Sequence, residues 1–306
     1  MRAMLIVNPH ATSTTERRRD LFAHALAGTG MTLQVEHTAT RGHAVELGAK
    51  AREDGTALVV VHGGDGTVNE AVNGMLSAGV GPATPMLAVL PGGSTNVFAR
   101  ALGMAQDPIV ATEQILEALE ARRNRIVSVG RAGDRFFTFN AGLGLDAEVV
   151  KAVEDHRATG RGISNSLHVR QAVRQFFATN RSTPRLTVTA GGQTTPGLFL
   201  AILSNVDPWT YMANRPVRTN PGLAADGGLG LLALRSLRLM TTLRVARQLV
   251  GRRSGPRGRA VLRVDDTDLV TVTASEPVGL QLDGDYLGER TEVEFRSVPR
   301  ALRVVV

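Results

Sequence analysis

Residues 57–76 read ALVVVHGGDGTVNEAVNGML, a strand pattern, a glycine turn and a helical pattern in direct succession. The apolar run from Ala57 to Val61 is typical of a parallel strand that is buried on both faces. Apolar residues then return at helical spacing from Val68 to Met75. Because this order places glycines at the end of a strand and the positive end of a helix at one point, it predicts a phosphate site.

The turn supplies the groups that such a site needs. Glycine occupies three of four positions and lets backbone N–H groups approach an anion closely, because no Cβ intervenes. A carboxylate beside phosphates would be repelled unless it were linked to a metal ion or accepted a proton or hydrogen bond. The alternative is a tight turn in which Asp65 only caps a helix. The predicted cofactor-binding residues here are Gly63, Gly64, Asp65, Gly66, Thr67, Asn69 and Glu70.

A second turn of the same kind follows at residues 91–96, which read PGGSTN. A strand pattern at 86–90 precedes it and a short helical pattern follows, so both glycine turns fall at carboxyl ends of strands, where doubly wound sheets bind ligands. Taken alone, this turn would be interpreted as an ordinary helix cap. As the second glycine turn of one parallel sheet, it predicts a shared nucleotide site that includes Gly92, Gly93, Ser94, Thr95 and Asn96.

These turns resemble the catalytic domain of the soluble diacylglycerol kinase and sphingosine kinase superfamily. The matching segments are GGDGT at 63–67, NE at 69–70, NG at 73–74, PGGSTNVFAR at 91–100 and, more weakly, DGGL at 226–229 and DGD at 283–285. The resemblance implies an enzyme that uses ATP and Mg²⁺ to transfer the γ-phosphoryl group to a hydroxyl of a diacylglycerol or sphingoid-base lipid. It also implies that the Thr40 hydroxyl contacts the nucleotide, with a helix cap as the alternative.

The late acidic motif supplies further candidate catalytic groups. Asp283 and Asp285 flank a glycine after an apolar strand pattern, and an Asp-Gly surface turn is the alternative. The resemblance makes the last acid of this motif the proton acceptor from the lipid hydroxyl. That acid is Asp285 here, whereas the family usually has the longer Glu. Asp283 would support the metal or the base and Asp65 would organise magnesium and phosphates, so all three are predicted catalytic residues.

The resemblance implies a structural magnesium ion on the Asp226 carboxylate and the carbonyls of Leu223 and Gly228, an oxygen set that suits Mg²⁺ or Ca²⁺. A simple turn is the alternative. The positions that lack an acid common in the family are Val97, Ser128 and Gly230. Because the acidic network is thinner, a catalytically impaired nucleotide- or lipid-binding protein stays an alternative. NAD kinase shares Gly-Gly-Asp-Gly-Thr and is the alternative among enzymes.

The order of the predicted elements divides the chain into two domains. Strands that alternate with helices over residues 1–124 predict an α/β domain with a doubly wound parallel sheet that binds nucleotide. Strand patterns dominate residues 125–296 and predict a mainly antiparallel β-rich domain. The resemblance implies that this domain contributes the lipid site and that the two domains have the NAD kinase/diacylglycerol kinase-like fold. Within the β-rich domain, residues 135–140 are expected to form one strand. The resemblance implies that residues 297–306 return to the first domain.

Charge and composition limit the partners. The chain has a net charge of +7 and a pI near 10.9, which would ordinarily suggest nucleic acid or an anionic membrane surface. Lys50 and Lys151 are the only lysines, so the charge follows an arginine-rich genomic composition. Since no recognition motif accompanies the charge, we expect no nucleic-acid partner.

No segment suggests an anchor or a leader. The apolar run at the start is too short for a signal peptide, and no apolar stretch reaches the length of about 18 residues that a spanning helix needs. The absence of cysteine excludes disulfides and thiolate catalysis. We therefore expect a cytoplasmic protein, peripheral to the membrane, that meets its lipid substrate at the membrane surface, with a homodimer as an open alternative.

Overall fold

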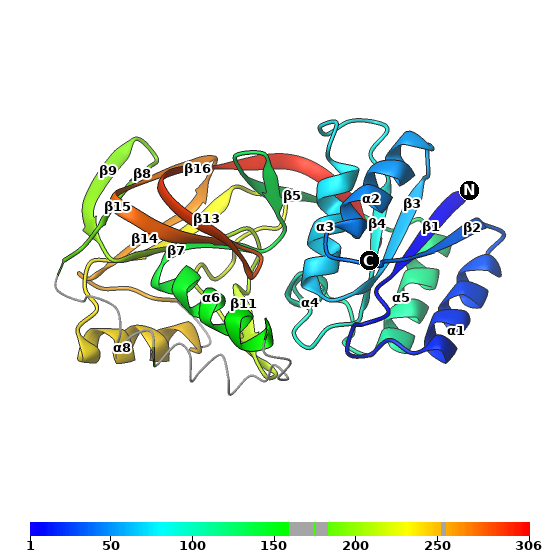
Figure 1. Cartoon of the computed structure of the whole chain (residues 1–306), viewed down its shortest axis with the longest axis horizontal. Coiled ribbons are helices and arrows are strands. Elements are labelled where there is room, and N and C mark those ends of the chain that lie inside the picture. Colours follow the sequence, from blue (N-terminus) through cyan, green and yellow to red (C-terminus); the bar gives the residue numbers. More distant parts are fainter. Residues whose placement is uncertain (159–173, 175–182, 252–254) are drawn as a thin grey trace. The chain divides into compact units, whose positions relative to one another are not determined.

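The computed structural model describes residues 1–158, 174, 183–251 and 255–306 (Figure 1). The chain forms two compact units, of which unit 1 comprises Met1–Val129 with Pro299–Val306 and unit 2 comprises Gly130–Val298. The sequence pattern predicts these two boundaries slightly earlier, after residues 124 and 296.

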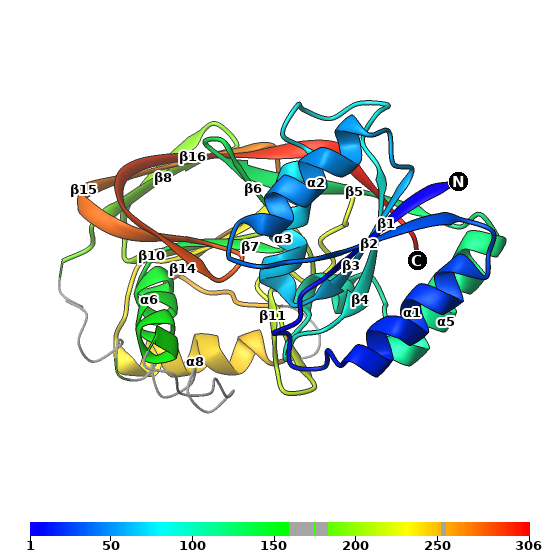
Figure 2. The same ribbon diagram turned by 45° about the vertical axis from the view of Figure 1, so that its right-hand side comes forward.

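Unit 1 has a parallel sheet in the order β2-β1-β3-β4. Its strands are β1 (Arg2–Val7), β2 (Thr32–His37), β3 (Leu58–Gly63) and β4 (Met86–Pro91), and its helices are α1 (Glu16–Ala27), α2 (His43–Glu53), α3 (Asp65–Met75), α4 (Val97–Ala101) and α5 (Pro108–Glu120). Helices α2 and α3 cover one face of the sheet, and α1 and α5 cover the other (Figures 1 and 2). All six residues of β3 are buried, as its apolar run predicts, and the doubly wound fold is confirmed.

The C-terminal residues add to the same sheet. Val304 pairs in parallel with Leu87 of β4, and the backbone N–H of Val305 donates to the Leu87 carbonyl at 2.8 Å. Strand β16 (Asp285–Val304) therefore begins in unit 2 and ends in unit 1.

Glycines set the packing of α2 against α3. A Cβ at Gly74 would lie 2.0 Å from the Val45 carbonyl oxygen, and a Cβ at Gly48 would lie 2.3 Å from the Ala71 carbonyl oxygen. The backbones of the two helices therefore touch at two reciprocal points. Gly74, which the sequence presents as part of an Asn-Gly pair, is a helix contact and not a turn, since α3 continues to Met75.

Unit 2 is mainly antiparallel, which confirms the second half of the predicted fold. Its main sheet runs β14-β13-β10-β7-β15-β16, β8 pairs with β15 and β9, and β11 and β12 form a separate ribbon. The elements are β5 (Arg125–Ala132), which crosses the boundary between the units, β6 (Arg135–Phe137), β7 (Asn140–Gly144), α6 (Leu145–Ala158), β8 (Leu186–Ala190), β9 (Gln193–Leu198), β10 (Leu200–Ser204), β11 (Thr210–Met212), β12 (Arg215–Val217), β13 (Leu229–Leu234), α8 (Leu239–Leu249), β14 (Val261–Thr267) and β15 (Leu269–Leu282).

Two apolar clusters hold unit 2 together. The larger one centres on the aromatic pair Phe137 and Phe295, whose rings meet edge to face at 6.2 Å. The smaller one includes Leu200 and Leu232 of the sheet together with Val245 of α8. Helices α6 and α8 lie on the same side of this sheet (Figures 1 and 2).

The prediction of a single strand at residues 135–140 is wrong, because two strands share this range. Strand β6 ends at Phe137 and β7 starts at Asn140, because the backbone between them turns to bind the carboxylate of Asp283. A buried acid that is distant in sequence thus interrupts an otherwise regular strand pattern.

Two glycines of α3 allow a matched test of this packing. We expect Gly74→Ala to lower the free energy of unfolding by about 1 to 3 kcal/mol, because the new methyl group meets the backbone of α2. Gly66→Ala in the same helix meets nothing within 4 Å and should raise it by about 0.5 to 1 kcal/mol through helix propensity. Urea denaturation of both variants checks the pair, and equal effects would contradict the glycine contact.

Candidate functional site

The two glycine turns of unit 1 pack backbone against backbone. Gly63 lies opposite Pro91 in the parallel pairing of β3 with β4, and the Gly92 N–H donates to the Gly63 carbonyl at 2.8 Å. A Cβ at Gly92 would lie 2.8 Å from the Gly63 Cα, and one at Gly93 would lie 2.8 Å from the Gly64 Cα. Close approach of the two turns therefore requires glycine at these positions, independently of any ligand.

Gly66 has no such role in packing. A Cβ there would have nothing within 4 Å, and the residue lies in the first turn of α3, whose backbone is helical. Glycine in a helix costs about 1 kcal/mol relative to alanine. Among the glycines of the first turn, Gly66 is thus the one whose absent side chain leaves open space beside the exposed N–H groups at a helix start.

Asp65 joins the two turns. One carboxylate oxygen accepts from the Val97 N–H at 2.9 Å and the other accepts from the Phe98 N–H at 3.2 Å. These are the first two residues of α4, so Asp65 caps that helix and its charge lies at the positive end of the helix dipole. Asp65 therefore acts as a cap, but for α4 and not for α3, the helix that contains it. The N-cap residue of α3 is Gly64.

Asn96 closes the second turn. Its side-chain oxygen accepts from the Gly93 N–H at 2.9 Å, and its side-chain NH₂ donates to the Gly93 carbonyl at 2.8 Å. The residue has a φ of +48° and is buried. Ser94 is exposed and Thr95 is half-buried, and α4 has no side-chain cap from its own N-cap residue. The two hydroxyls therefore do not cap α4, and they lie beside the turn that Asn96 holds.

The loop after β1 supports both turns and was not predicted as part of the site. The Asn8 side chain donates to the Thr67 hydroxyl at 2.9 Å, and the Ser13 N–H donates to the Gly92 carbonyl at 3.0 Å. The Ser13 hydroxyl also donates to the Pro91 carbonyl. A signal was present, since Asn8 directly follows a buried strand at the same edge of the sheet.

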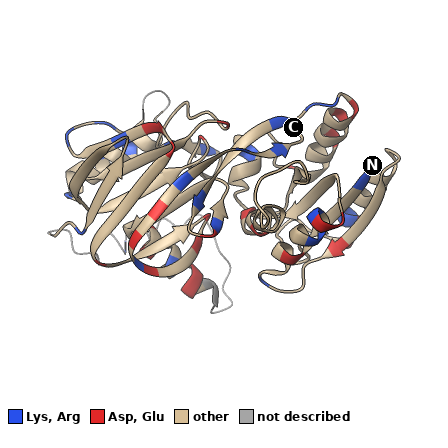
Figure 3. Ribbon diagram, turned by 90° about the horizontal axis from the view of Figure 1, so that it is seen from above, with Lys and Arg blue, Asp and Glu red and all other residues tan. Residues whose placement is uncertain are grey.

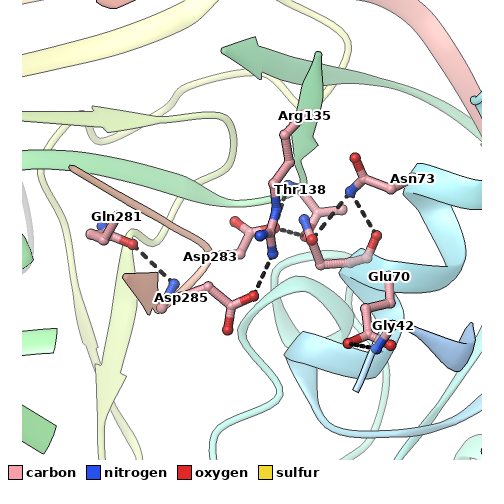
Figure 4. A network of polar contacts seen from close by, with 10 residues as sticks. Gly42, Glu70, Asn73, Arg135, Thr138, Gln281, Asp283 and Asp285 are labelled. Atoms are coloured by element: carbon pink, nitrogen blue, oxygen red, sulfur yellow. Dashed lines mark hydrogen bonds and ion pairs between the residues drawn. The ribbon is translucent and has the colours of Figure 1, made fainter. Parts of the chain in front are cut away.

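Three other predicted cofactor residues differ in setting. Glu70 accepts from the Gly42 N–H at 2.9 Å and thereby ties α3 to the start of α2 (Figure 4). Asn69 is buried, and both its backbone and its side-chain oxygen accept from the Asn73 amide. Thr40 is exposed, and the N-cap of α2 is Gly42, so the cap alternative does not describe the Thr40 hydroxyl.

His62 is a packing residue. It is fully buried, its ring nitrogens face the Thr14 hydroxyl at 2.9 Å and the Leu90 carbonyl at 3.2 Å, and its ring meets Phe22 edge to face. Burial lowers the pKa of His62, which keeps the imidazole neutral near pH 7.

In unit 2, Asp283 forms part of a hairpin turn. Asp283 and Gly284 connect β15 to β16, and both have positive φ, as a two-residue type I′ turn requires. The Asp283 carboxylate accepts from the N–H groups of Thr138, Phe139 and Asn140 and from the Thr138 hydroxyl, at 2.6 to 2.9 Å (Figure 4). Burial raises the pKa of Asp283 while these four donors oppose the shift. The four bonds are internal to unit 2, and they hold the β6–β7 connection.

Asp285 occupies the first position of β16, opposite Leu282, and has a different environment. Its side chain is 21% exposed, and one carboxylate oxygen forms an ion pair with Arg135 of β6 (Figure 4). Arg135 was not predicted as a site residue, because it is distant in sequence and lies within a strand pattern. Of the two acids in the motif, Asp285 is the one that keeps contact with solvent.

Asp146 is a further acid that was not predicted from the sequence. It lies in the first turn of α6, and it accepts from the Gln281 side chain at 2.7 Å. A Cβ at Gly142 would lie 1.8 Å from one of its oxygens, so that glycine makes room for the carboxylate. Burial raises the pKa of Asp146 to about 6, and the hydrogen bond from Gln281 opposes the shift only in part.

The predicted metal ligands lie in a turn. The Gly227 N–H donates to the Ala224 carbonyl, and Asp226 between them is exposed. The Gly228 N–H donates to the Asp266 carboxylate at 2.6 Å. The described residues contain no group of three or more His, Cys, Asp or Glu that could hold a metal ion. A cation at Leu223, Asp226 and Gly228 would depend mainly on carbonyl oxygens, and this site stays a prediction.

Two of the positions that lack the expected acid have a structural reason. Val97 is buried, and its backbone N–H is one of the two that Asp65 binds. A Cβ at Gly230 would lie 2.6 Å from the side chain of Asn220, whose amide donates to the Val264 carbonyl and the Asp265 carboxylate. An acid has no space at 230. Ser128 is fully buried, and nothing in the structure explains why it replaces an acid.

Comparisons with known proteins show the family of the chain. Residues 2–129 match the model of the diacylglycerol kinase catalytic domain. A protein of Chromohalobacter salexigens named "Probable lipid kinase YegS-like" is 32% identical over 80% of this chain and 74% of its own length. The diacylglycerol kinase of Bacillus subtilis is 28% identical over 100% of this chain and 96% of its own length. The chain belongs to the lipid kinase family that carries the diacylglycerol kinase catalytic domain.

The fold has solved relatives of the same kind. A crystal structure of a diacylglycerol kinase from Bacillus anthracis superposes with a TM-score of 0.74 over 99% of this chain and 96% of that chain, at 21% sequence identity. None of the helices in the described part of the chain has the length and apolar character needed to cross a bilayer.

The raised pKa of Asp146 predicts a pH-dependent stability. Its unfolded-state pKa is about 3.9, so its stabilising contribution is complete below about pH 4 and is lost as the pH rises to about 6. We expect Asp146→Asn to be more stable than the wild type at pH 7 by about 1 to 2 kcal/mol, allowing for partial exposure. This advantage should disappear towards about pH 4.

Urea denaturation across this pH range measures the effect. Asp155→Asn makes the same chemical change at an exposed position of α6 and should alter stability by less than about 0.5 kcal/mol at any pH. A stability difference for Asp146→Asn that does not change with pH would contradict the assignment of a raised pKa.

Proposed function

We propose that the enzyme transfers the γ-phosphoryl group of ATP to a hydroxyl of a diacylglycerol or sphingoid-base lipid at the membrane surface. The observation that supports this proposal best is the pair of glycine turns, which lie at the ends of adjacent parallel strands and are joined through Asp65. Such turns present backbone N–H groups and a helix start to an anion, which is the usual way to hold nucleotide phosphates without a lysine.

In this proposal unit 1 binds the nucleotide. Gly66 leaves space beside the start of α3, and the exposed Ser94 and half-buried Thr95 offer hydroxyls next to the second turn. Magnesium is commonly bound by one or two carboxylates together with substrate phosphates, and a single acid such as Asp65 fits that pattern. Bound there, the ion would neutralise phosphate charge.

Asp285 takes the role of general base towards the lipid hydroxyl. It is partly exposed, and its ion pair with Arg135 fixes the direction of one carboxylate oxygen. Asp283 has a positioning role instead of the metal or base role expected from the sequence, because its two oxygens already accept four hydrogen bonds. It holds the turn from which Asp285 projects.

Two alternatives to a lipid kinase can be distinguished from it, an NAD kinase-like enzyme and a binding protein without catalysis. The relatives are named lipid or diacylglycerol kinases, which favours a lipid acceptor over NAD. A binding protein without catalysis is favoured by one observation, the absence of an acid at Val97, Ser128 and Gly230, where the family commonly has one. Turnover of ATP with a mixed lipid extract separates an enzyme from a binding protein, because only an enzyme produces phosphorylated lipid.

The nucleotide site can be tested at Gly66. We expect Gly66→Ala to fold and to bind ATP about tenfold or more weakly, because the methyl group fills the open space beside the N–H groups of α3. Gly81→Ala is the matched control in unit 1, since its Cβ meets only an arginine side chain at 4.0 Å. Calorimetric titration with ATP measures both, and unchanged affinity in Gly66→Ala would remove the first turn from the site.

The base can be tested at Asp285. Asp285→Asn keeps the shape but removes the proton acceptor, so kcat for lipid phosphorylation should fall by roughly 10²- to 10⁴-fold with little change in ATP affinity. Arg135→Gln removes the same ion pair but retains the carboxylate, and it should cost much less in kcat. Asp134→Asn, at an exposed neighbouring turn, should be neutral.

Comparison of the two variants decides the role. Equal losses in Asp285→Asn and Arg135→Gln would show that the ion pair is structural and that Asp285 is not the base. Asp285→Glu introduces the longer acid that the family usually has here. A higher turnover would show that the shorter acid is a handicap, and a lower turnover would show that the backbone has adapted to aspartate. Wild-type turnover in Asp285→Asn would move the search for the base to Asp65.

A further inference from the structure

The positive charge of the chain is concentrated in one segment. Residues 227–264 contain nine arginines and no acidic residue, whereas the whole chain has a net charge of only +7. The remainder of the chain is therefore slightly acidic, and both signs are interspersed over the elements of unit 1 (Figure 3). An arginine-rich genome would not by itself place the excess in a single stretch, so this segment has a local reason for its charge.

Helix α8 lies within this segment and buries only one side. Val245 is buried and Leu249 is half-buried, and both pack against the small apolar cluster on the sheet of unit 2. These two residues are one helical turn apart and mark the inner face. The opposite face of α8 is exposed along its whole length.

The exposed face carries large apolar side chains. Leu239 is 48% exposed, Met240 77%, Leu243 51% and, at the C-cap, Val250 38%. At 100° per residue, Leu239, Leu243 and Val250 form one stripe, and Met240 lies beside it on the side of Arg244 and Arg247. These are the most clustered exposed apolar residues of the described chain, in which the others are scattered. Clustered exposed apolar side chains on a surface helix mark an interaction site.

We propose that α8 is an interfacial helix that docks the enzyme on an anionic lipid bilayer. A helix with an apolar stripe beside arginines and no acid inserts its apolar side chains at the headgroup boundary while its arginines meet lipid phosphates. The exposed arginines Arg235, Arg238 and Arg247 supply this charge complementarity at α8. The inference rests on the proposed function, since a lipid acceptor is what brings the enzyme to a bilayer.

Vesicle binding of the full chain tests the proposal. The wild type should sediment with vesicles of phosphatidylcholine and phosphatidylglycerol more than with phosphatidylcholine alone, and less as salt increases. The apolar variant Leu239→Gln/Met240→Gln/Leu243→Gln should bind at least about tenfold more weakly. The charge variant Arg238→Gln/Arg247→Gln should bind roughly 30-fold more weakly at low salt.

Matched controls come from unit 1. Leu21, Ile109 and Val110 are 40 to 45% exposed on α1 and α5, and replacing all three with glutamine should leave vesicle binding unchanged. Arg17→Gln/Arg123→Gln is the control for charge, since both residues are exposed. Circular dichroism melts establish that every variant is folded. Wild-type vesicle binding by both α8 variants, or no binding to anionic vesicles by the wild type, would overturn the proposal.

Two further measurements separate the explanations. Binding to duplex DNA that requires the arginines but not the apolar residues, without vesicle binding, would assign the surface to nucleic acid and overturn the proposal.

Phosphorylation of diacylglycerol in neutral detergent micelles should be equal in the wild type and the α8 variants. If the wild type were inactive there while vesicle binding still depended on α8, the kinase proposal would fail and the docking helix would stand. Activity in micelles together with vesicle binding that does not depend on α8 would overturn the docking helix and leave the kinase proposal intact.

Discussion

The backbone contact between the two glycine turns is the constraint on which the arrangement of unit 1 around its glycine motif depends. Gly92 and Gly93 lie so close to Gly63 and Gly64 that a Cβ at either position would reach the backbone of the first turn. This contact places the starts of α3 and α4 beside each other and puts Asp65 of one helix within reach of the first N–H groups of the other. A parallel sheet supplies the approach, and glycine makes it close enough for one carboxylate to serve both turns.

The same contact changes what the glycine motif means. The sequence suggested that glycines were present to admit phosphate oxygens, yet Gly92 and Gly93 are accounted for by packing alone. Only Gly66 keeps open space on its Cβ side, and it is also in a helix, where glycine is unfavourable. A motif can therefore predict the fold correctly while most of its residues act through structure. Gly74 shows the same effect, since it serves the contact of α3 with α2.

Much of the fold could be predicted because its signals are local. Buried strands, helical spacing and glycine turns are read within windows of about ten residues, and they predicted both the parallel sheet and the antiparallel half. The partners of the acids could not be predicted in this way. Asp285 meets Arg135 and Asp283 meets residues 138–140 across more than 140 positions, and only the folded chain brings them together. Asp146 was missed for the same reason, because its raised pKa comes from burial and not from a motif.

The two acids of the Asp-Gly-Asp motif illustrate how finely the fold separates roles. They are two positions apart, but one is a central residue of a type I′ turn and the other is the first residue of a strand. The turn directs Asp283 into a ring of backbone donors, and the strand leaves Asp285 at the edge of solvent with a guanidinium beside it. Shortening the acid at 285 from the usual Glu therefore does not shorten a free side chain. It shortens one whose direction is set from two sides, by the hairpin that carries it and by the guanidinium that holds it.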